Sequence, residues 1–190
     1  MSTRFLLWIV AGANALVAGM TYALLGWNRT GAPAATRNTA RFAGVCFLLA
    51  FAAPALVHFA KRLPSEATLV LAFVAAQGVH FAAVIVLLSG FERAHVLQNP
   101  LQTVLVFTLG FGLVLTAALT AQPRTVRWYT VLRTFALYVI FLIFTLGFGF
   151  NQIKPLRILS VLLLVALVAR LTTRVQSRTH VVTDGTGLLP

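Results

Sequence analysis

Residues 68–89 contain no charged side chain, and this apolar segment restricts the fold of the chain more than any other feature. A helix needs about 20 mostly apolar residues to cross the hydrocarbon core of a bilayer, and the segment is long enough. Gln77 and His80 nevertheless lie near its middle, three residues apart, so a helix places both side chains on one face. Polar groups at that depth cost free energy unless they have partners, and they often mark functional sites.

The composition of the whole chain indicates the same class of protein. Of its 190 residues, 59% are hydrophobic and 9% are charged, whereas soluble domains average about 25% charged residues. The formal charge is +12, but most basic residues flank apolar segments, where they face lipid head groups. Basic patches with interleaved aromatic residues do not occur. We therefore predict a membrane protein whose partner is the lipid bilayer and not nucleic acid.

Six apolar segments predict an all-α, polytopic membrane protein that forms a six-helix bundle. The predicted transmembrane domain covers residues 1–172, with helices at residues 5–26, 42–60, 68–89, 101–121, 128–150 and 156–171. Residues 27–40 are expected to form a polar loop, and residues 173–190 a flexible polar tail. The first segment resembles a signal peptide at its start, but its apolar residues continue well past residues 11–13, which favours a retained helix.

Two features of the first two segments predict how their helices pack. Ala11, Ala15, Gly19 and Ala23 recur every four residues and form a smooth stripe, which another helix backbone can approach closely. Pro54 lies inside the second segment. It should kink that helix and free a backbone carbonyl, which a neighbouring helix can satisfy.

The loops carry a weak signal for orientation. Those on the side of the N-terminus contain slightly more Lys and Arg than those on the opposite side. Because basic loops tend to stay in the cytoplasm, we expect both termini there, with the chain in a bacterial inner membrane.

Several classes of enzyme are excluded by what the apolar segments lack. They contain no Asp or Glu, so they offer neither a catalytic triad, nor a pair of acids, nor a carboxylate proton relay. P-loop and GxGxxG motifs are absent from the sequence. Cys46 is the single cysteine, which excludes an internal disulfide and a cysteine-based metal cluster.

One layer of polar residues remains as a candidate site. The first, third and fifth predicted helices run in the same direction, and Asn14, Gln77, His80 and Tyr138 all lie near the middle of these helices. Polar residues at such positions tend to meet through helix contacts. Two interpretations are open. The layer is either a hydrogen-bonded cluster that holds the helices in register, or a ligand site with His80 as the metal or haem ligand.

The expected depths of the other histidines and of one arginine restrict which residues can belong to such a site. His58 and His95 are expected near the membrane surfaces and His180 in the tail, and about 15 Å of helix separates the depth of His58 from that of His80. His80 is therefore the best available metal ligand. Arg133 falls about one turn inside the fifth segment, where it either snorkels to the head groups or forms a deliberate internal charge.

Three stretches of sequence resemble a known family. Residues 39–44 (Thr-Ala-Arg-Phe-Ala-Gly) with residues 48–54 (Leu-Leu-Ala-Phe-Ala-Ala-Pro) are similar to the opening of ferric reductase-like transmembrane domains. Those domains are six-helix bundles related to the haem subunit of methionine sulfoxide reductase and to NADPH oxidases. Residues 75–80 (Ala-Ala-Gln-Gly-Val-His) resemble the family's ligand helix, in which His80 matches the second of two histidines and Gln77 replaces the first.

The third stretch resembles the fifth helix of the family. It consists of Trp128, Leu132-Arg133, Leu137-Tyr138 and residues 142–144 (Leu-Ile-Phe). With one extra residue after Trp128, Arg133 occupies the position of the family's haem-ligating histidine.

The resemblance implies a b-type haem that transfers electrons across the membrane. It implies His80 as the iron ligand in a five-coordinate or weakly six-coordinate haem, with Asn14, Gln77 and Tyr138 around the cofactor. Arg133 has no lone pair for iron, but it suits a haem propionate. The chain has no FAD or NAD(P)H domain of its own, so electron transfer would require a separate redox partner. The alternative is a haem-free scaffold, assembly partner or small-solute permease.

Overall fold

The computed structural model describes residues 2–56, 63–91, 100–121, 127–149 and 154–184, with side chains for residues 2–56, 63–91, 108–121, 128–146 and 158–173. These residues form an all-α bundle, as predicted. Its helices are α1 (Thr3–Leu25), α2 (Gly31–Leu56), α3 (Glu66–Gly90), α5 (Pro100–Ala121), α6 (Arg127–Gly149) and α7 (Lys154–Asp184).

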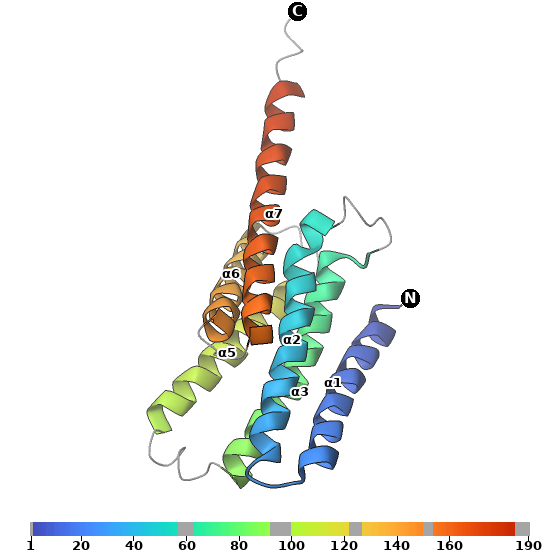
Figure 1. Ribbon diagram of the computed structural model, residues 1–190. Coiled ribbons are helices and arrows are strands. Elements are labelled where there is room, and N and C mark those ends of the chain that lie inside the picture. Colours follow the sequence, from blue (N-terminus) through green and yellow to red (C-terminus); the bar gives the residue numbers. More distant parts are fainter. Residues whose placement is uncertain (1, 57–62, 92–99, 122–126, 150–153, 185–190) are drawn as a thin grey trace, which may run out of the picture.

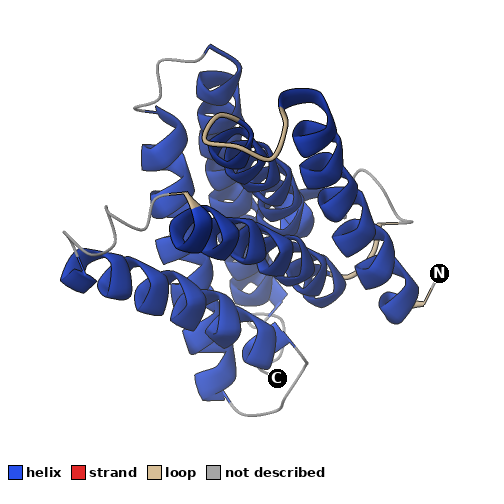
Figure 2. Cartoon of the chain, turned by 90° about the horizontal axis from the view of Figure 1, so that it is seen from below, coloured by secondary structure: helices blue, strands red, loops and turns tan. Residues whose placement is uncertain are grey.

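The helices form a closed ring with one helix outside it. Neighbours in the ring are α2 and α3, α3 and α5, α5 and α6, α6 and α7, and finally α7 and α2. α1 packs on α2 and α3 from outside (Figure 1). Figure 2 shows from below that the described residues form helices and short connections, with no strand among them.

Stacked aromatic side chains fill the centre of the ring. Phe47 of α2 stacks on Phe144 of α6 at 5.3 Å between ring centroids, and Phe51 stacks on Phe141 at 5.0 Å. Phe73 of α3 meets Phe47 edge-on at 5.1 Å. Such pairs add about 0.5 to 1.5 kcal/mol each beyond the apolar area that they bury. The space between α2 and α6 is therefore protein core.

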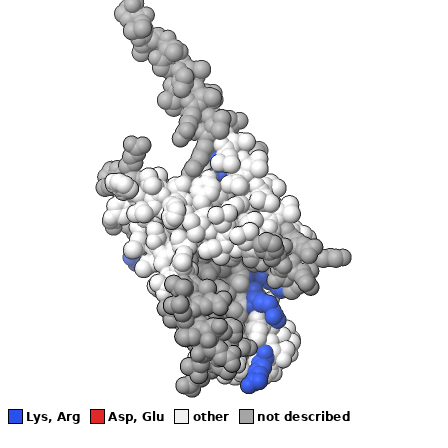
Figure 3. All heavy atoms as spheres, turned by 90° about the vertical axis from the view of Figure 1, so that its left-hand side faces the viewer, with Lys and Arg blue, Asp and Glu red and all other residues white. Residues whose placement is uncertain are grey.

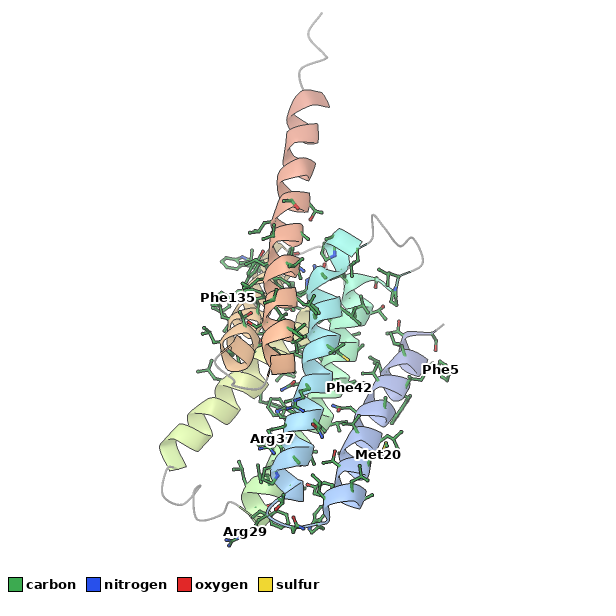
Figure 4. All side chains as sticks on the ribbon, viewed as in Figure 1. Phe5, Met20, Arg29, Arg37, Phe42 and Phe135 are labelled. Atoms are coloured by element: carbon green, nitrogen blue, oxygen red, sulfur yellow. The ribbon has the colours of Figure 1, made fainter. Side chains whose placement is uncertain are left out.

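Apolar side chains cover much of the outer surface. Trp8 is 78% exposed and Leu24 is 79% exposed, and Phe5, Met20 and Phe135 project away from the bundle (Figure 4). On the face drawn in Figure 3, Lys and Arg gather in only a few places. A soluble protein rarely exposes so much apolar surface, whereas lipid covers it without cost.

Helix length and composition agree with a membrane location. Within the described residues, α1, α2, α3 and the part of α6 from Trp128 to Leu146 are long and apolar enough to cross a bilayer. The apolar stretches Thr108–Ala121 of α5 and Ile158–Thr173 of α7 are shorter. The chain is thus a multi-pass helical membrane protein. Its bacterial inner membrane and cytoplasmic termini stay predictions.

The predicted polar loop at residues 27–40 is wrong, because α2 begins at Gly31. Asn28 Oδ1 accepts hydrogen bonds from the amides of Thr30 (2.8 Å) and Gly31 (2.9 Å), which starts the helix. Pro33 lies in the first turn, where its missing N–H is not needed. Gly26 ends α1 at φ +80°, and a Cβ on Gly31 would clash with its carbonyl oxygen. The turn between α1 and α2 is therefore very tight.

The polar residues of that segment make hydrogen bonds between helices. Asn38 Nδ2 donates to Thr21 Oγ1 on α1 at 3.1 Å. The Thr36 hydroxyl lies 3.3 Å from the carbonyl of Ala83 on α3 and 3.0 Å from a carbonyl one turn earlier in its own helix. Within α2, Arg41 Nη1 donates to Asn38 Oδ1 at 3.0 Å. Side chains that suggested a loop thus hold α1, α2 and α3 together.

Two further expectations differ from the structure. Ala15, Gly19 and Ala23 are exposed on the outside of α1, so the small-residue stripe contacts no helix among the described side chains. α1 turns Asn14 and Thr21 toward the bundle instead. α7 continues to Asp184 and projects beyond the other helices (Figure 1), past its predicted end at residue 171. Residues 172–184 contain neither Gly nor Pro, so nothing in them stops the helix.

Candidate functional site

Asn14 ties α1 to the middle of α3. Its Nδ2 donates to the carbonyl of Ala76 at 2.7 Å, and the side chain is fully buried. In the regular helix pattern the same carbonyl accepts the backbone N–H of His80. Asn14 therefore lies one helical turn from His80, close to it as predicted, but bonded to backbone.

His80 contacts a hydroxyl of α2. Its Nδ1 lies 3.2 Å from Thr39 Oγ1, which also lies 2.9 Å from the carbonyl oxygens of Ala35 and Thr36. Thr39 has one hydroxyl proton, and the two shorter contacts direct it to the carbonyls of its own helix. We therefore assign the His80 proton to Nδ1, which donates to Thr39. This tautomer leaves a lone pair on Nε2.

A cavity of about 620 Å³ lies between α3, α5 and α6. α3 contributes Phe73, Gln77, His80 and Phe81 to its wall, and the residues from α5 and α6 are all apolar. His80 and Gln77 are thus the polar side chains of this cavity.

Gln77 is the second polar residue of the wall. It is 8% exposed, and its Oε1 has no hydrogen-bond partner among the described residues. A buried amide oxygen without a partner costs about 1 to 3 kcal/mol. Because this oxygen is itself buried, a molecule in the cavity contacts other atoms of Gln77.

The structure places Arg133 in a different cluster. Its Nη2 lies 4.0 Å from Glu66 Oε2, and Glu66 Oε1 accepts from Arg170 Nη2 at 2.7 Å. The Arg133 side chain is 21% exposed, which supports an internal charge and not a snorkelling one. Glu66 precedes His80 on α3 by about 21 Å of helix. Arg133 therefore lies far from His80.

Tyr138 also lies away from the wall of the cavity. Its ring meets Phe51 of α2 edge-on at 5.5 Å, and the next residue, Val139, lines the cavity. The expected single layer is thus divided. Asn14, Gln77 and His80 lie together on one level of α3, whereas Tyr138 belongs to the aromatic core.

Sequence reasoning missed Arg170 and Thr39. Arg170 is 3% exposed, donates to the Phe51 carbonyl at 2.7 Å, and covers the Phe51 ring. Pro54 removes the N–H that would bond to the carbonyl of the residue before Phe51, so it did not point to the Phe51 carbonyl, and no signal in the sequence identified this contact. Thr39 lay in the expected loop, and no signal in the sequence paired it with His80.

The donor set can be tested against a metal or haem. Among the described residues, no group of three or more His, Cys, Asp or Glu side chains can hold a metal ion. His80 suits haem iron as a single axial ligand. However, the described residues that line the cavity include no charged side chain and no second histidine, so none of them would hold the propionates or the sixth iron position. The side chains of His58, His95 and His180 lie outside the described residues.

Comparisons with known proteins identify no relative. No family model matches the sequence, and neither a curated protein nor a solved structure matches it.

Proposed function

We propose that this membrane protein binds an uncharged, lipophilic ligand in the cavity between α3, α5 and α6, with His80 and Gln77 as polar contacts. The cavity itself supports this most strongly. Its volume of about 620 Å³ falls in the range of small-molecule sites, about 300 to 1,000 Å³. Apart from the two polar residues of α3, its wall is apolar.

The absence of charge on the wall favours a neutral ligand. A charged group inside a bilayer costs free energy unless a counter-charge lies beside it. Among the described arginines, Arg133 and Arg170 are occupied by Glu66. The proposal is thus a form of the haem-free alternative to electron transfer, in which the protein has a defined ligand site.

A b-type haem that transfers electrons is the second candidate, and the His80 contact with Thr39 favours it. A ligating histidine usually donates its other ring nitrogen to an acceptor, which fixes the ring and its tautomer. His80 would hold the iron through Nε2, and Thr39 would orient the ring. Haem supplies one-electron chemistry when bound, and a separate redox partner would be required. Arg133 does not contact the haem in this second candidate.

One purification tests both candidates. The protein is expressed with ample haem, purified in detergent, and measured by absorption spectroscopy and by mass spectrometry of an organic extract. We expect no Soret band and a retained lipophilic molecule. Gly110→Leu, which fills the cavity, should remove that molecule, and Gly112→Leu, with open space around its Cβ, should keep it.

One outcome of this experiment would contradict the lead proposal, and another would contradict both candidates. A Soret band in the wild type that His80→Ala abolishes and His58→Ala leaves nearly unchanged would overturn the lead proposal in favour of haem. A wild type with neither a Soret band nor a retained molecule would contradict both candidates.

A further inference from the structure

We infer that the ligand is a lipid-soluble molecule with a hydrogen-bond-donor head group, such as a hydroxyl, and that it reaches His80 sideways from the bilayer. This inference rests on the proposed function and specifies its ligand. It follows from the His80 acceptor on the wall, the lack of charge among the described lining residues, and the position of the exposed lining residues.

His80 offers an acceptor to the cavity. Its Nδ1 is committed to Thr39, so Nε2 has a lone pair, and no described residue donates to it. Gln77 also lines the cavity, but its Oε1 is itself buried, so that oxygen is not an open acceptor. A ligand that satisfies His80 must bring a proton, as a hydroxyl or an N–H group does.

The site lies too deep in the membrane for a polar ligand to reach it from water. His80 lies ten residues before the end of α3 at Gly90, which corresponds to about 15 Å of helix. The lining from α5 and α6 is apolar throughout. The remainder of the ligand is therefore apolar.

The mouth of the cavity faces the lipid. Leu109 of α5 and Ile143 of α6 line the cavity and are 58% and 51% exposed. Their neighbours Phe111 and Leu142 are 56% and 54% exposed, so this surface is apolar and lipid-facing. Figure 1 shows α5 diverging from α2 and α3 toward its N-terminal end. A ligand dissolved in the bilayer can therefore pass between Leu109 and Ile143.

A pair of probes tests the head group. We choose 4-decylphenol and its methyl ether, which differ in one donor. Each is added to the wild-type protein in phosphatidylcholine nanodiscs, and the amount retained above empty nanodiscs is measured by mass spectrometry. We expect the phenol to bind about tenfold more tightly, as one hydrogen bond allows. In His80→Ala this preference should fall to about twofold or less.

Variants of α5 test the location. Gly110→Leu should abolish retention of both probes, because a Cβ on Gly110 already lies 3.7 Å from Phe81 in the cavity wall. Gly112→Leu is its matched control and should retain both, because its Cβ meets nothing within 4 Å. Equal helical circular dichroism of the variants shows that they fold.

Variants at the mouth test the route. Leu109→Trp and Ile143→Trp should slow association of 4-decylphenol at least threefold. Leu115→Trp should leave it unchanged, because Leu115 is 45% exposed on α5 and does not line the cavity. Equal association rates in the mouth variants and the wild type would overturn the sideways route.

The remaining outcomes separate this inference from the proposed function. If both probes are retained equally and Gly110→Leu removes both, the cavity binds ligands but the inferred donor is wrong. If the wild type retains neither probe, this inference and the proposed function fail together.

Discussion

Two polar regions lie along α3, and they differ in what surrounds their polar atoms. Near its start, Glu66 Oε1 accepts from Arg170 Nη2 at 2.7 Å, and Arg170 Nη1 donates to the Phe51 carbonyl at 2.7 Å. In its middle, Gln77 and His80 line a cavity, and no described residue donates to His80 Nε2.

The difference separates a structural role from a ligand site. The cluster of Glu66, Arg170 and Arg133 joins α3, α7, α6 and a backbone carbonyl of α2, so its charges stabilise the ring of helices only as a set. His80 keeps the Nε2 lone pair free of described partners and lines the cavity. Gln77 is one of several described residues with a buried polar atom that lacks a partner, and it also lines the cavity.

The largest predicted loss of stability follows from a change in the cluster of Glu66, Arg170 and Arg133. Arg170→Met removes one partner and leaves Glu66 and the Phe51 carbonyl without their main donor. We expect the free energy of unfolding to fall by about 3 to 5 kcal/mol, measured by denaturant titration of the protein in detergent.

Two further variants complete this test. Adding Glu66→Gln to Arg170→Met should recover part of the loss, because no unpaired carboxylate remains. Arg37→Met is the matched control at an exposed arginine and should change stability by less than about 0.5 kcal/mol. A loss no larger than that of Arg37→Met would show that the cluster does not stabilise the ring.

A smaller loss of stability is predicted for Asn14, which attaches α1 to α3 one helical turn from His80. Asn14→Leu keeps the size of the side chain but removes the 2.7 Å hydrogen bond to Ala76. We expect a loss of about 1 kcal/mol in the same titration. Leu16→Ala, at a residue 63% exposed on the same helix, should have a smaller effect. A larger loss of stability for Leu16→Ala than for Asn14→Leu would show that Asn14 is not what attaches α1 to the bundle.

The smallest effect on stability is predicted for His80. Thr39 already bonds to the carbonyls of its own helix, so His80→Ala leaves no buried donor without a partner. We expect a loss below about 1 kcal/mol, together with a clear loss of ligand preference. A loss as large as that of Arg170→Met would instead make His80 a structural residue, and the comparison between the two regions would fail.

The sequence predicted the helices well because apolar runs of membrane length have few alternatives. It failed at α2, where a glycine, Pro33 and three threonines suggested a loop. Asn38 contacts α1 and Thr39 contacts α3. Ala32 and Ala35 are fully buried between the helices. Alternation of small and polar residues predicts a loop and a tight helix interface equally well, and only packing separates them.

The candidate site was predicted in part. Asn14, Gln77 and His80 were placed on one level, because helix direction and spacing determine depth. Tyr138 was assigned to the same level and Arg133 to a propionate about one turn inside the helix, but side-chain direction around α6 depends on neighbours that spacing does not specify. The partners Thr39 and Arg170 come from distant parts of the chain, so only the fold brings them to α3.

The most direct test is photolabelling of the cavity. A 4-alkylphenol with a diazirine in its chain is irradiated with the protein in phosphatidylcholine vesicles, and the labelled peptides are mapped by mass spectrometry. We predict labelling of α5 and α6 around Leu109 and Ile143 that excess 4-decylphenol and Gly110→Leu both suppress. Labelling that neither suppresses, and that is as strong at Leu16 and Leu24 on the outside of α1, would contradict a ligand site in this cavity.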